Sequence, residues 1–384
     1  MRILVTGGAG FIGSHIVDTY LQAGHEVWVL DDLSRGKREQ VNPHAPFVRM
    51  DLRSPGLKDL LAEGNFDCIN HHAAQIDVRV SVADPTRDAM INIVGTLNLL
   101  EAARAHGVPR FIFASTGGAI YGEQRHFPAT EHHPTSPLSP YGVAKLAVEH
   151  YLEYYRQVHG LRYVVLRYAN VYGPRQDPEG EAGVVAIFCG RVLRKQRLII
   201  YGDGEQTRDY VFVGDVARAN LLVLNYLTRV IKSVESVESV ECGPRIRPQL
   251  NNSITQRINS SRESIESGRS SESRLNRLNN STTQQLNNSN NVFNIGTGVE
   301  TSVNALAAML LEAADADCPV VHQPGRQGEQ LRSVIDAEKA NLVLGWNPLT
   351  PVTDGLIQTL AWFRSKEAVR TQRSAVSLGS GTDR

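Results

Sequence analysis

The chain has 384 residues, enough for one large domain or two smaller ones, and its hydrophobic content of 41% is ordinary for a globular protein. Its formal net charge is zero, so the charge gives no indication of a nucleic-acid partner. Its four cysteines lack the spacing of metal ligands, and no apolar run reaches the length of a membrane span. We therefore expect no metal and no membrane anchor. Because an apolar strand is expected from the second residue, leaving no room for a secretory signal, we expect a reducing, cytoplasmic location.

The first elements are an apolar strand at residues 3–5, a turn with glycines at Gly7, Gly10 and Gly13, and a helix at 14–23. This order suits a dinucleotide pyrophosphate. The first glycine allows a tight turn, the second lets the backbone approach the phosphates, and the third lets helix and strand pack closely. The helix N-terminus then presents free N–H groups to the anion. A glycine-rich turn without a ligand is the alternative, but the strand and helix around it favour a dinucleotide.

A second apolar strand, residues 26–30, ends in Asp31 and Asp32. An acid about twenty residues past the glycines is placed to bind the adenosine ribose. We favour Asp31, because it stands at the strand end, where its carboxylate accepts from the ribose 2′-hydroxyl and repels a 2′-phosphate. The cofactor is therefore expected to be NAD, although the basic residues from Arg35 onward weaken the discrimination and Asp31 as a plain turn residue is the alternative.

Strands and helices continue to alternate. Short apolar runs at 47–50, 66–70, 110–114 and 163–166 predict strands, and apolar residues at helical spacing predict a helix at 91–106. Such alternation predicts an α/β fold with a doubly wound parallel sheet. Its ligand is expected at the carboxyl ends of the strands.

Residues 231–291 break this pattern. They contain no aromatic residue, are rich in Ser, Asn, Glu and Arg, and repeat themselves, with Ser-Val-Glu three times in a row. Such a composition cannot bury enough apolar area to offset the entropy of ordering, so it predicts a disordered insertion. The flanks, 215–226 and 292–298, predict a helix and a strand with its turn, and the polar tail at 364–384 is expected to be flexible.

A second motif is Tyr141-Gly-Val-Ala-Lys145. Ser139 is expected to cap a helix with Pro140 at its first position, continuing to about Val158. Tyr141 and Lys145 then share a face at i and i+4. An ammonium beside the phenol lowers the phenol pKa, which makes Tyr141 a usable general base. An amphipathic surface helix is the alternative, which the dinucleotide motif disfavours.

The strand at 110–114 is followed by Ser115 and Thr116. A hydroxyl at the carboxyl end of a parallel strand points toward the ligand crevice. An ordinary turn is the alternative.

Together these motifs resemble the extended short-chain dehydrogenase/reductases and, within them, the UDP-glucose 4-epimerase group of nucleotide-sugar enzymes. The resemblance covers about residues 1–363 apart from the insertion. Further matching segments are His71-His72-Ala73-Ala74-Gln75, Asn92 with Gly95-Thr96, Arg167 to Arg175, Gly202 to Tyr210, Phe293 to Gly298 and Arg326 to Glu329.

The resemblance implies roles for specific residues. Tyr141 would be the base, Lys145 its activator and a ribose ligand, and Thr116, or Ser115 beside it, the hydroxyl bonded to the sugar oxygen. The implied cofactor-binding residues are Gly7, Gly10, Phe11, Ile12, Gly13, Asp31, Asp32, Asp51, Leu52, Ala73, Ala74 and Asn92, together with Tyr141 and Lys145. The implied residues for the nucleotide sugar are Asn170, Arg208, Arg326, Glu329 and Ser333.

The implied reaction is NAD-dependent inversion at C4 of a UDP-hexose through a transient 4-keto sugar, without net redox. Two departures matter. The segment after Thr116 is one residue longer than in many members, which leaves Ser115 and Thr116 both open as the hydroxyl. Related 4,6-dehydratases carry an Asp-Glu pair where Gly117 and Gly118 stand, which argues against dehydration.

Ser333 lies four residues past Glu329, where the family borders the sugar pocket near the 2-substituent. A small residue there implies acceptance of the N-acetyl sugars as well as of UDP-glucose and UDP-galactose. The alternative is a strand residue whose side chain points elsewhere.

The resemblance implies an NAD-binding domain at 1–172, to which 206–230 and 292–298 return. A smaller nucleotide-sugar-binding subdomain would comprise 173–205 and 299–363, and a homodimer is expected. Two other functions stay open. One is another nucleotide-sugar enzyme, such as a uronate epimerase or decarboxylase. The other, disfavoured by the intact tyrosine and lysine, is a non-catalytic NAD-binding regulator.

Overall fold

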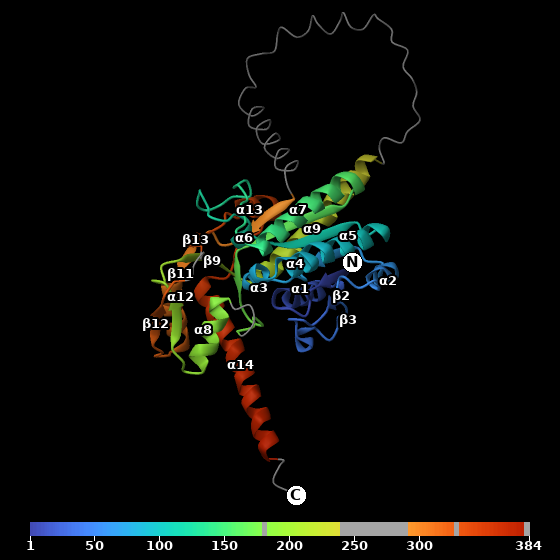
Figure 1. Ribbon diagram of the computed structural model, residues 1–384. Coiled ribbons are helices and arrows are strands. Elements are labelled where there is room, and N and C mark those ends of the chain that lie inside the picture. The colour runs from blue at the N-terminus through green and yellow to red at the C-terminus, as the bar shows by residue number, and fades with distance from the viewer. Residues whose placement is uncertain (179–182, 239–290, 326–329, 380–384) are drawn as a thin grey trace, which may run out of the picture. The chain divides into compact units, whose positions relative to one another are not determined.

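Figure 1 shows the chain as a computed structural model that describes residues 1–178, 183–238, 291–325 and 330–379. The chain divides into two compact units, Met1–Leu227 with Val292–Arg384, and Thr228–Asn291. Of the second unit, the structure describes the end of one helix, residues 228–238, and Asn291. Every element that bears on function belongs to the first.

A seven-stranded sheet forms the centre of the first unit, in the order β10-β6-β5-β4-β1-β2-β3, and each neighbouring pair is parallel. The strand order reverses between β1 and β4, so a ligand crevice is expected at the carboxyl ends of these two strands. The predicted doubly wound parallel sheet is therefore confirmed. Its strands are β1 (Arg2–Thr6), β2 (Glu26–Asp31), β3 (Phe47–Arg49), β4 (Cys68–His71), β5 (Arg110–Thr116), β6 (Arg162–Tyr168) and β10 (Val292–Ile295).

Helices cover both faces of this sheet. Ile3 and Val5 belong to an apolar cluster shared with the helices α1 and α9, whereas Leu4 belongs to a second cluster shared with α2, α5 and α7. Successive strand residues point to opposite faces, so a strand buried on both faces is apolar throughout, which explains the uninterrupted run in β1. These helices are α1 (Phe11–Gln22), α2 (Leu57–Gly64), α5 (Gly95–Ala105), α7 (Pro140–His159) and α9 (Val213–Glu238). Shorter helical segments are α3 (Val78–Ala83), α4 (Pro85–Ala89), α6 (Gly117–Ile120), α13 (Glu338–Leu344), the 3₁₀ helix η1 (Arg38–Gln40) and the π-helix η2 (Met90–Val94).

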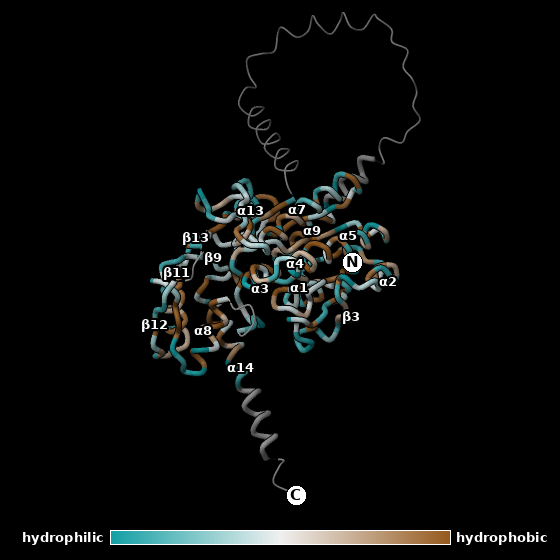
Figure 2. Tube along the Cα trace, in the orientation of Figure 1, coloured by the Kyte–Doolittle hydropathy of each residue, from teal (hydrophilic) through white to brown (hydrophobic). Residues whose placement is uncertain are grey.

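A separate apolar core, which includes Phe188, Leu310 and Leu356, lies among three further helices and two small sheets. Figure 1 shows most of these elements at the left and the last helix running down toward the C-terminus, and Figure 2 shows the hydrophobic colour of α8 against the hydrophilic outer turns. The helices are α8 (Val184–Leu193), α12 (Val303–Ala314) and α14 (Val352–Gly379). The strands are β7 (Asn170–Tyr172), β9 (Thr207–Phe212), β11 (Glu300–Ser302) and β13 (Arg332–Ser333) in one sheet, and β8 (Leu198–Tyr201) and β12 (Val320–Gln323) in the other.

Three boundaries differ from the sequence prediction. β9, which lies in the range assigned to the NAD-binding domain, pairs with β7, β11 and β13 in the small sheet. α9 continues to Glu238, inside the predicted insertion, and residues 239–290 lie outside the described part. α14 continues to Gly379, through most of the tail that was expected to be flexible. Neither extension contains proline, or glycine before its last residue, so nothing in either sequence ends the helix early. The end of α14 is also rich in helix-favouring Arg, Lys, Glu and Ala.

Candidate active site

The glycine turn after β1 lies against the loop that follows β4. Gly7 has a φ of +71°, and a Cβ built there would lie 2.6 Å from the backbone nitrogen of Ala73. A Cβ on Gly13 would collide with the backbone of Gly7, and one on Gly10 would lie 3.1 Å from the Gly7 carbonyl oxygen. Each of the three positions therefore admits only glycine or strongly favours it. α1 begins directly after Gly10 without a side-chain cap, so its first N–H groups are available to an anion.

Asp31 and Asp32 separate in the structure. The Asp31 carboxylate is buried and accepts hydrogen bonds from the backbone N–H of Ala9 at 3.0 Å and of Leu33 at 2.8 Å. Burial raises the pKa of this carboxyl group, and the two N–H donors oppose that effect. Asp32 is exposed and accepts from the Ser34 N–H at 2.8 Å, as a turn cap does. The glycine turn therefore binds the carboxylate of Asp31 and not that of Asp32.

The other predicted cofactor residues lie around the same edge. Ala73 and Ala74 follow β4 and are partly exposed beside Gly7, while Leu52 is buried in the sheet core. Asp51 forms an ion pair with Arg53 at 2.5 Å, and this partner lowers the pKa of its carboxyl group. Phe11 and Ile12 open α1 as its first two residues.

Asn92 braces the loop after β4. It lies in η2, and its amide exchanges two hydrogen bonds of 2.8 Å with the backbone of Gln75 while also donating to Asp88 at 3.0 Å. A π-helical turn often marks a functional position, because the extra residue re-aims a side chain. Asn92 therefore acts here on the loop that carries Ala73 and Ala74.

α7 begins as predicted, with Ser139 accepting from the Gly142 N–H at 3.2 Å and Pro140 in its first turn. Lys145 is only 4% exposed, and its Nζ donates to the Ala114 carbonyl of β5 at 2.9 Å. The same Nζ lies 5.9 Å from the centre of the Tyr141 ring, and Tyr141 is partly exposed. The helix thus places a buried ammonium beside an accessible phenol at the carboxyl end of β5.

Ser115 and Thr116 face opposite ways, as neighbours in a strand do. The Ser115 hydroxyl is buried and donates to Glu149 at 2.6 Å. Thr116 is partly exposed, and a Cβ built at Gly118 would lie 3.9 Å from its Oγ1 and 3.6 Å from the Asn170 Oδ1. The structure therefore brings Thr116 and Asn170 to one spot, and this favours Thr116 over Ser115 as the hydroxyl that meets a sugar.

Of the remaining residues predicted to bind the nucleotide sugar, Arg208 and Ser333 are neighbours, because β9 pairs with β13 at this position. Arg208 is partly buried and donates to the Thr207 carbonyl at 2.8 Å, while Ser333 is only 3% exposed. The burial of Ser333 agrees with the alternative that it is a strand residue whose side chain points away from the sugar pocket. Arg326 and Glu329 lie outside the described residues.

His71 and His72 lie at the carboxyl end of β4, in a segment that resembles the family but implied no role for either residue. His71 bonds the hydroxyls of Thr6 at 2.6 Å and Thr96 at 2.9 Å, and His72 bonds and stacks on Tyr168. Burial, and then the charge of Lys145, lowers the pKa of His72 to about 3 and that of His71 well below its ordinary value. Both are therefore neutral at physiological pH. In the sequence, only their position at the end of a buried strand pointed to these two residues.

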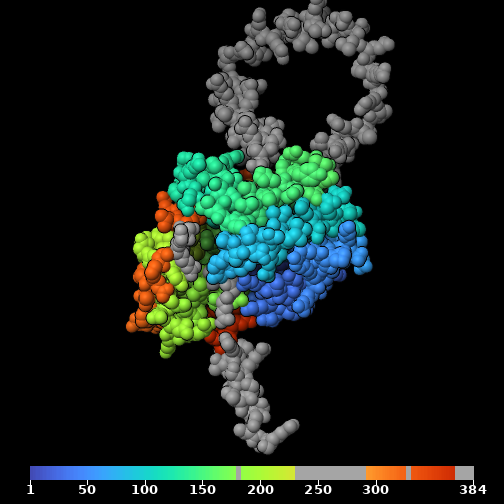
Figure 3. All heavy atoms as spheres, in the orientation of Figure 1, coloured from blue at the N-terminus to red at the C-terminus, as the bar shows by residue number. Residues whose placement is uncertain are grey.

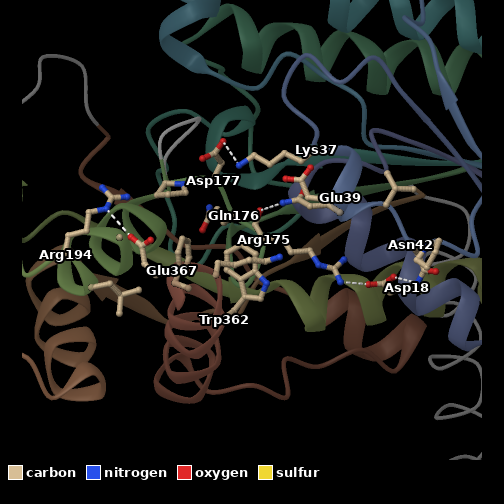
Figure 4. Close-up of a pocket in the computed structure, with 18 of the residues that line it drawn as sticks. Asp18, Lys37, Glu39, Asn42, Arg175, Gln176, Asp177, Arg194, Trp362 and Glu367 are labelled. Atoms are coloured by element: carbon tan, nitrogen blue, oxygen red, sulfur yellow. Dashed lines mark hydrogen bonds and ion pairs between the residues drawn. The ribbon is translucent and has the colours of Figure 1, made fainter. Parts of the chain in front are cut away.

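Figure 3 shows the surface hollowed between the light-blue segment that holds α3 and α4 and the yellow-green and orange segments. A different cavity, of about 790 Å³, lies among α1, residues 37–43, residues 175–178, α8 and α14. No predicted site residue lines it. Figure 4 shows that three of its cations pair with carboxylates: Arg175 with Asp18 at 2.6 Å, Lys37 with Asp177 at 3.6 Å and Arg194 with Glu367 at 3.6 Å. Within each pair the carboxylate neutralises the charge of the cation, so we place the catalytic site at the strand ends and not in this cavity.

Among the described residues, no group of three His, Cys, Asp or Glu side chains is placed to hold a metal ion. Within the same part of the chain, no helix has both the length and the apolar character needed to cross a membrane.

Comparison with known proteins agrees with this geometry. The model of the NAD dependent epimerase/dehydratase family matches residues 3–233. The UDP-glucose 4-epimerase of Mycolicibacterium smegmatis is 39% identical over 374 residues, covering 95% of this chain and 99% of that protein. The crystal structure of the Thermotoga maritima UDP-glucose 4-epimerase with UDP-glucose is 41% identical, with a TM-score of 0.76 over 95% of this chain and 99% of that one. The Thermus thermophilus enzyme in complex with NAD is 40% identical, with a TM-score of 0.74 and the same coverage. The resemblance seen in the sequence is thus confirmed, and the chain belongs to the NAD dependent epimerase/dehydratase family.

Proposed function

We propose that the protein is an NAD-dependent epimerase that inverts C4 of a UDP-hexose, interconverting UDP-glucose and UDP-galactose. The observation that carries this proposal is the placing of Tyr141, Lys145 and Thr116 at one strand end, on the same edge of the sheet as the glycine turn. Near full-length similarity to UDP-glucose 4-epimerases supports it.

The residues at the glycine turn fit a dinucleotide. A side chain at Gly7 would collide with the backbone of Ala73, so glycine is what lets the turn and the loop after β4 approach each other. Asp31 is the last residue of β2, which is the position of the ribose-binding acid in dinucleotide sites. NAD bound there supplies the acceptor and donor of the C4 hydride. We assign to cofactor binding the residues Gly7, Gly10, Phe11, Ile12, Gly13, Asp31, Ala73, Ala74 and Asn92.

The chain's own residues then move the proton. Tyr141 as phenolate takes the proton from the sugar 4-hydroxyl, and the ammonium of Lys145 stabilises the phenolate. Thr116 and Asn170 hold the reacting end of the sugar through their polar atoms. The same phenol returns the proton after the 4-keto sugar presents its other face. Arg208 offers a guanidinium to the diphosphate, and Arg326 and Glu329 are proposed partners of the nucleotide.

A separate proposal concerns which substituent at C2 of the sugar the enzyme accepts. The UDP-N-acetylglucosamine 4-epimerase of Methanobrevibacter ruminantium, 30% identical, has the same fold with a TM-score of 0.74. Ser333, although buried, is small, and the Ser333→Tyr variant tests whether it borders the sugar. If it does, kcat/KM for UDP-N-acetylglucosamine falls relative to that for UDP-glucose. An unchanged ratio removes Ser333 from the pocket wall.

We also propose a cytoplasmic homodimer. α7 exposes an apolar stripe at helical spacing, with Val143, Tyr151, Tyr154 and Val158 between 40% and 58% exposed. A stripe of this kind suits a second copy of the same helix. The described cysteines are free and buried, as expected in a reducing compartment. Light scattering of the wild type and of Val158→Glu tests the dimer, and two equal monomeric masses would contradict it.

The experiment for the function is product analysis. The protein is incubated with UDP-glucose, UDP-galactose, UDP-N-acetylglucosamine and UDP-glucuronate, and products are identified by NMR. UDP-galactose formed from UDP-glucose is the expected result. Products only from UDP-glucuronate would instead identify a uronate epimerase or a decarboxylase, and no product from any sugar would favour a non-catalytic protein.

A further inference from the structure

A buried polar cluster lies behind the proposed catalytic residues and takes no part in the mechanism above. It consists of Ser115, Tyr121, Glu149, Arg167 and Asn294, here called the Glu149 cluster. These residues come from β5, the segment after α6, α7, β6 and β10. The cluster therefore joins a catalytic helix to three strands of the central sheet.

The centre of the cluster is an ion pair. Arg167 binds Glu149 through two bonds, Nη2 to Oε2 at 2.6 Å and Nε to Oε1 at 3.1 Å, and both side chains are 7% exposed. Burial lowers the pKa of the Arg167 guanidinium, but the hydrogen bond and charge of Glu149 outweigh burial, so its net pKa lies above the ordinary value. The third guanidinium nitrogen, Nη1, donates to the Tyr121 hydroxyl at 3.0 Å, and this hydroxyl donates to Asn294 at 2.7 Å.

Buried charges are costly to desolvate, and apolar residues of similar size often give equal or greater stability. A fully bonded buried pair is therefore better suited to fixing one geometry than to adding stability.

The spacing on α7 shows which geometry is fixed. Tyr141, Lys145 and Glu149 follow one another at i, i+4 and i+8, on one side of the helix. Lys145 donates to the carbonyl of Ala114, and Glu149 accepts from the hydroxyl of Ser115. Two successive turns of α7 are thus tied to two successive residues of β5. The next residue of β5 is Thr116.

We propose that Glu149 is a positioning residue for the reaction. Through Ser115 and Arg167 it sets the height and rotation of α7 on β5, so that Tyr141 and Lys145 stand in register with Thr116. Glu149 itself contacts neither sugar nor cofactor. This inference rests on the proposed function, because it names what orients the base of that reaction.

The test compares Glu149→Gln and Glu149→Asp with Glu153→Gln. Glu153 is a matched control, because it lies one turn further on α7 and also binds an arginine and a tyrosine, but its side chain is 38% exposed where that of Glu149 is 7% exposed. A misplacement of about 1 Å can cost about 100-fold in rate. We expect kcat to fall about 10- to 100-fold in both Glu149 variants, with KM and bound NAD within about twofold of wild type. The Glu153 variant is expected to match wild type.

The pH profile separates positioning from plain loss of charge. If Lys145 moves away from Tyr141, the phenolate loses its cation and the acid limb of kcat shifts to higher pH. If α7 stays in place, the Arg167 charge left unpaired by Glu149→Gln favours the phenolate, and the limb shifts to lower pH. The titratable groups around this region are Lys145, Arg167, Tyr121, Glu131, Lys339, His71 and His72. Both histidines stay neutral, and burial raises the pKa of Tyr121 to about 12, so that phenol stays protonated. A shift to lower pH, or a Glu149→Asp variant with wild-type kcat, would overturn the proposal.

Hydrogen exchange supplies a readout that does not depend on epimerisation. The amides of residues 141–149 are expected to exchange faster in Glu149→Asp than in Glu153→Gln. Equal protection in both variants would refute the positioning role even for an inactive protein. If instead the wild type epimerises no sugar while this difference appears, the proposed function fails and the role in holding α7 stands.

Discussion

At the scale of single residues, Tyr141 shows how much of the candidate site can be predicted from the sequence. Its spacing from Lys145 and the capping Ser139 were visible in the sequence, and the structure places the lysine ammonium 5.9 Å from its ring centre. The choice between Ser115 and Thr116 was not visible, because both end one strand. The structure separates them, because the Ser115 hydroxyl bonds Glu149, which lies thirty-four positions further along the chain. Long-range partners of this kind have no local signal in a single sequence.

The base is tested by Tyr141→Phe. The ring and its packing remain while the proton acceptor is lost, so turnover is expected to fall about 100- to 10,000-fold with bound NAD retained. Tyr151→Phe is the control, since Tyr151 is exposed on the same helix. The measurement is steady-state kinetics with UDP-galactose. A Tyr141→Phe enzyme with near wild-type turnover would show that another group takes the proton.

Cofactor choice is tested at Asp31. Its carboxylate, fixed by two backbone N–H groups, repels a 2′-phosphate, so wild-type apoprotein is expected to bind NAD at least about tenfold more tightly than NADP. In Asp31→Asn this preference is expected to shrink, whereas Asp32→Asn, which alters only a turn cap, keeps it. Titration of each apoprotein with both dinucleotides measures it. Loss of preference in Asp32→Asn alone would reverse the assignment.

At the scale of elements, helix beginnings were easier to predict than helix ends. Ser139 and Pro140 mark the start of α7 by side-chain chemistry that the sequence displays. The ends of α9 and α14 carry no proline or early glycine, and composition alone indicated disorder where the structure has helix. The π-helical turn of η2 was also invisible, because its reason is the tertiary contact between Asn92 and Gln75.

α1 contains a histidine, His15, whose contribution to the stability of the fold depends on pH. The ring of His15 bonds the Pro174 carbonyl at 2.9 Å, and burial, the largest effect, lowers its pKa to about 4. A histidine whose folded pKa lies below its unfolded value of 6.5 stabilises the fold above pH 6.5, and that contribution is lost as pH falls toward 4. By pH 5, this effect has lowered the free energy of unfolding by about 1 to 2 kcal/mol.

The prediction is that His15→Gln, which keeps a donor but does not titrate, loses about 1 to 2 kcal/mol less stability than wild type between pH 7 and pH 5. Urea unfolding at both pH values is the measurement. His44→Gln serves as control, because His44 is exposed and its ring takes no part in a described hydrogen bond. Equal losses in wild type and His15→Gln would rule out the anchor.

At the scale of the whole molecule, the alternation of apolar strands and helices was enough to predict the doubly wound sheet. It did not predict which sheet β9 joins, since its partners β7, β11 and β13 come from both sides of the insertion. β10 returns to the large sheet directly after that insertion, beside β6. Its Asn294 completes the Glu149 cluster.

Residues 233–290 are expected to be replaceable by about ten Gly/Ser residues, because loop closure varies as (3/2)RT ln n and a sixfold shorter loop favours folding by about 1.6 kcal/mol. No predicted site residue lies in this range. Circular dichroism and NAD binding of the shortened protein are the measurements. Failure to fold, or loss of NAD binding, would mean that the segment contributes to the packed structure.

The most direct test of the account follows the hydrogen on C4. UDP-galactose carrying deuterium at C4 is incubated with the purified protein without added NAD, and the product is examined by NMR and mass spectrometry. The account predicts UDP-glucose that keeps its deuterium at C4, because the same hydride leaves and returns within one site. Loss of the deuterium to solvent, or turnover only when NAD is consumed, would contradict it.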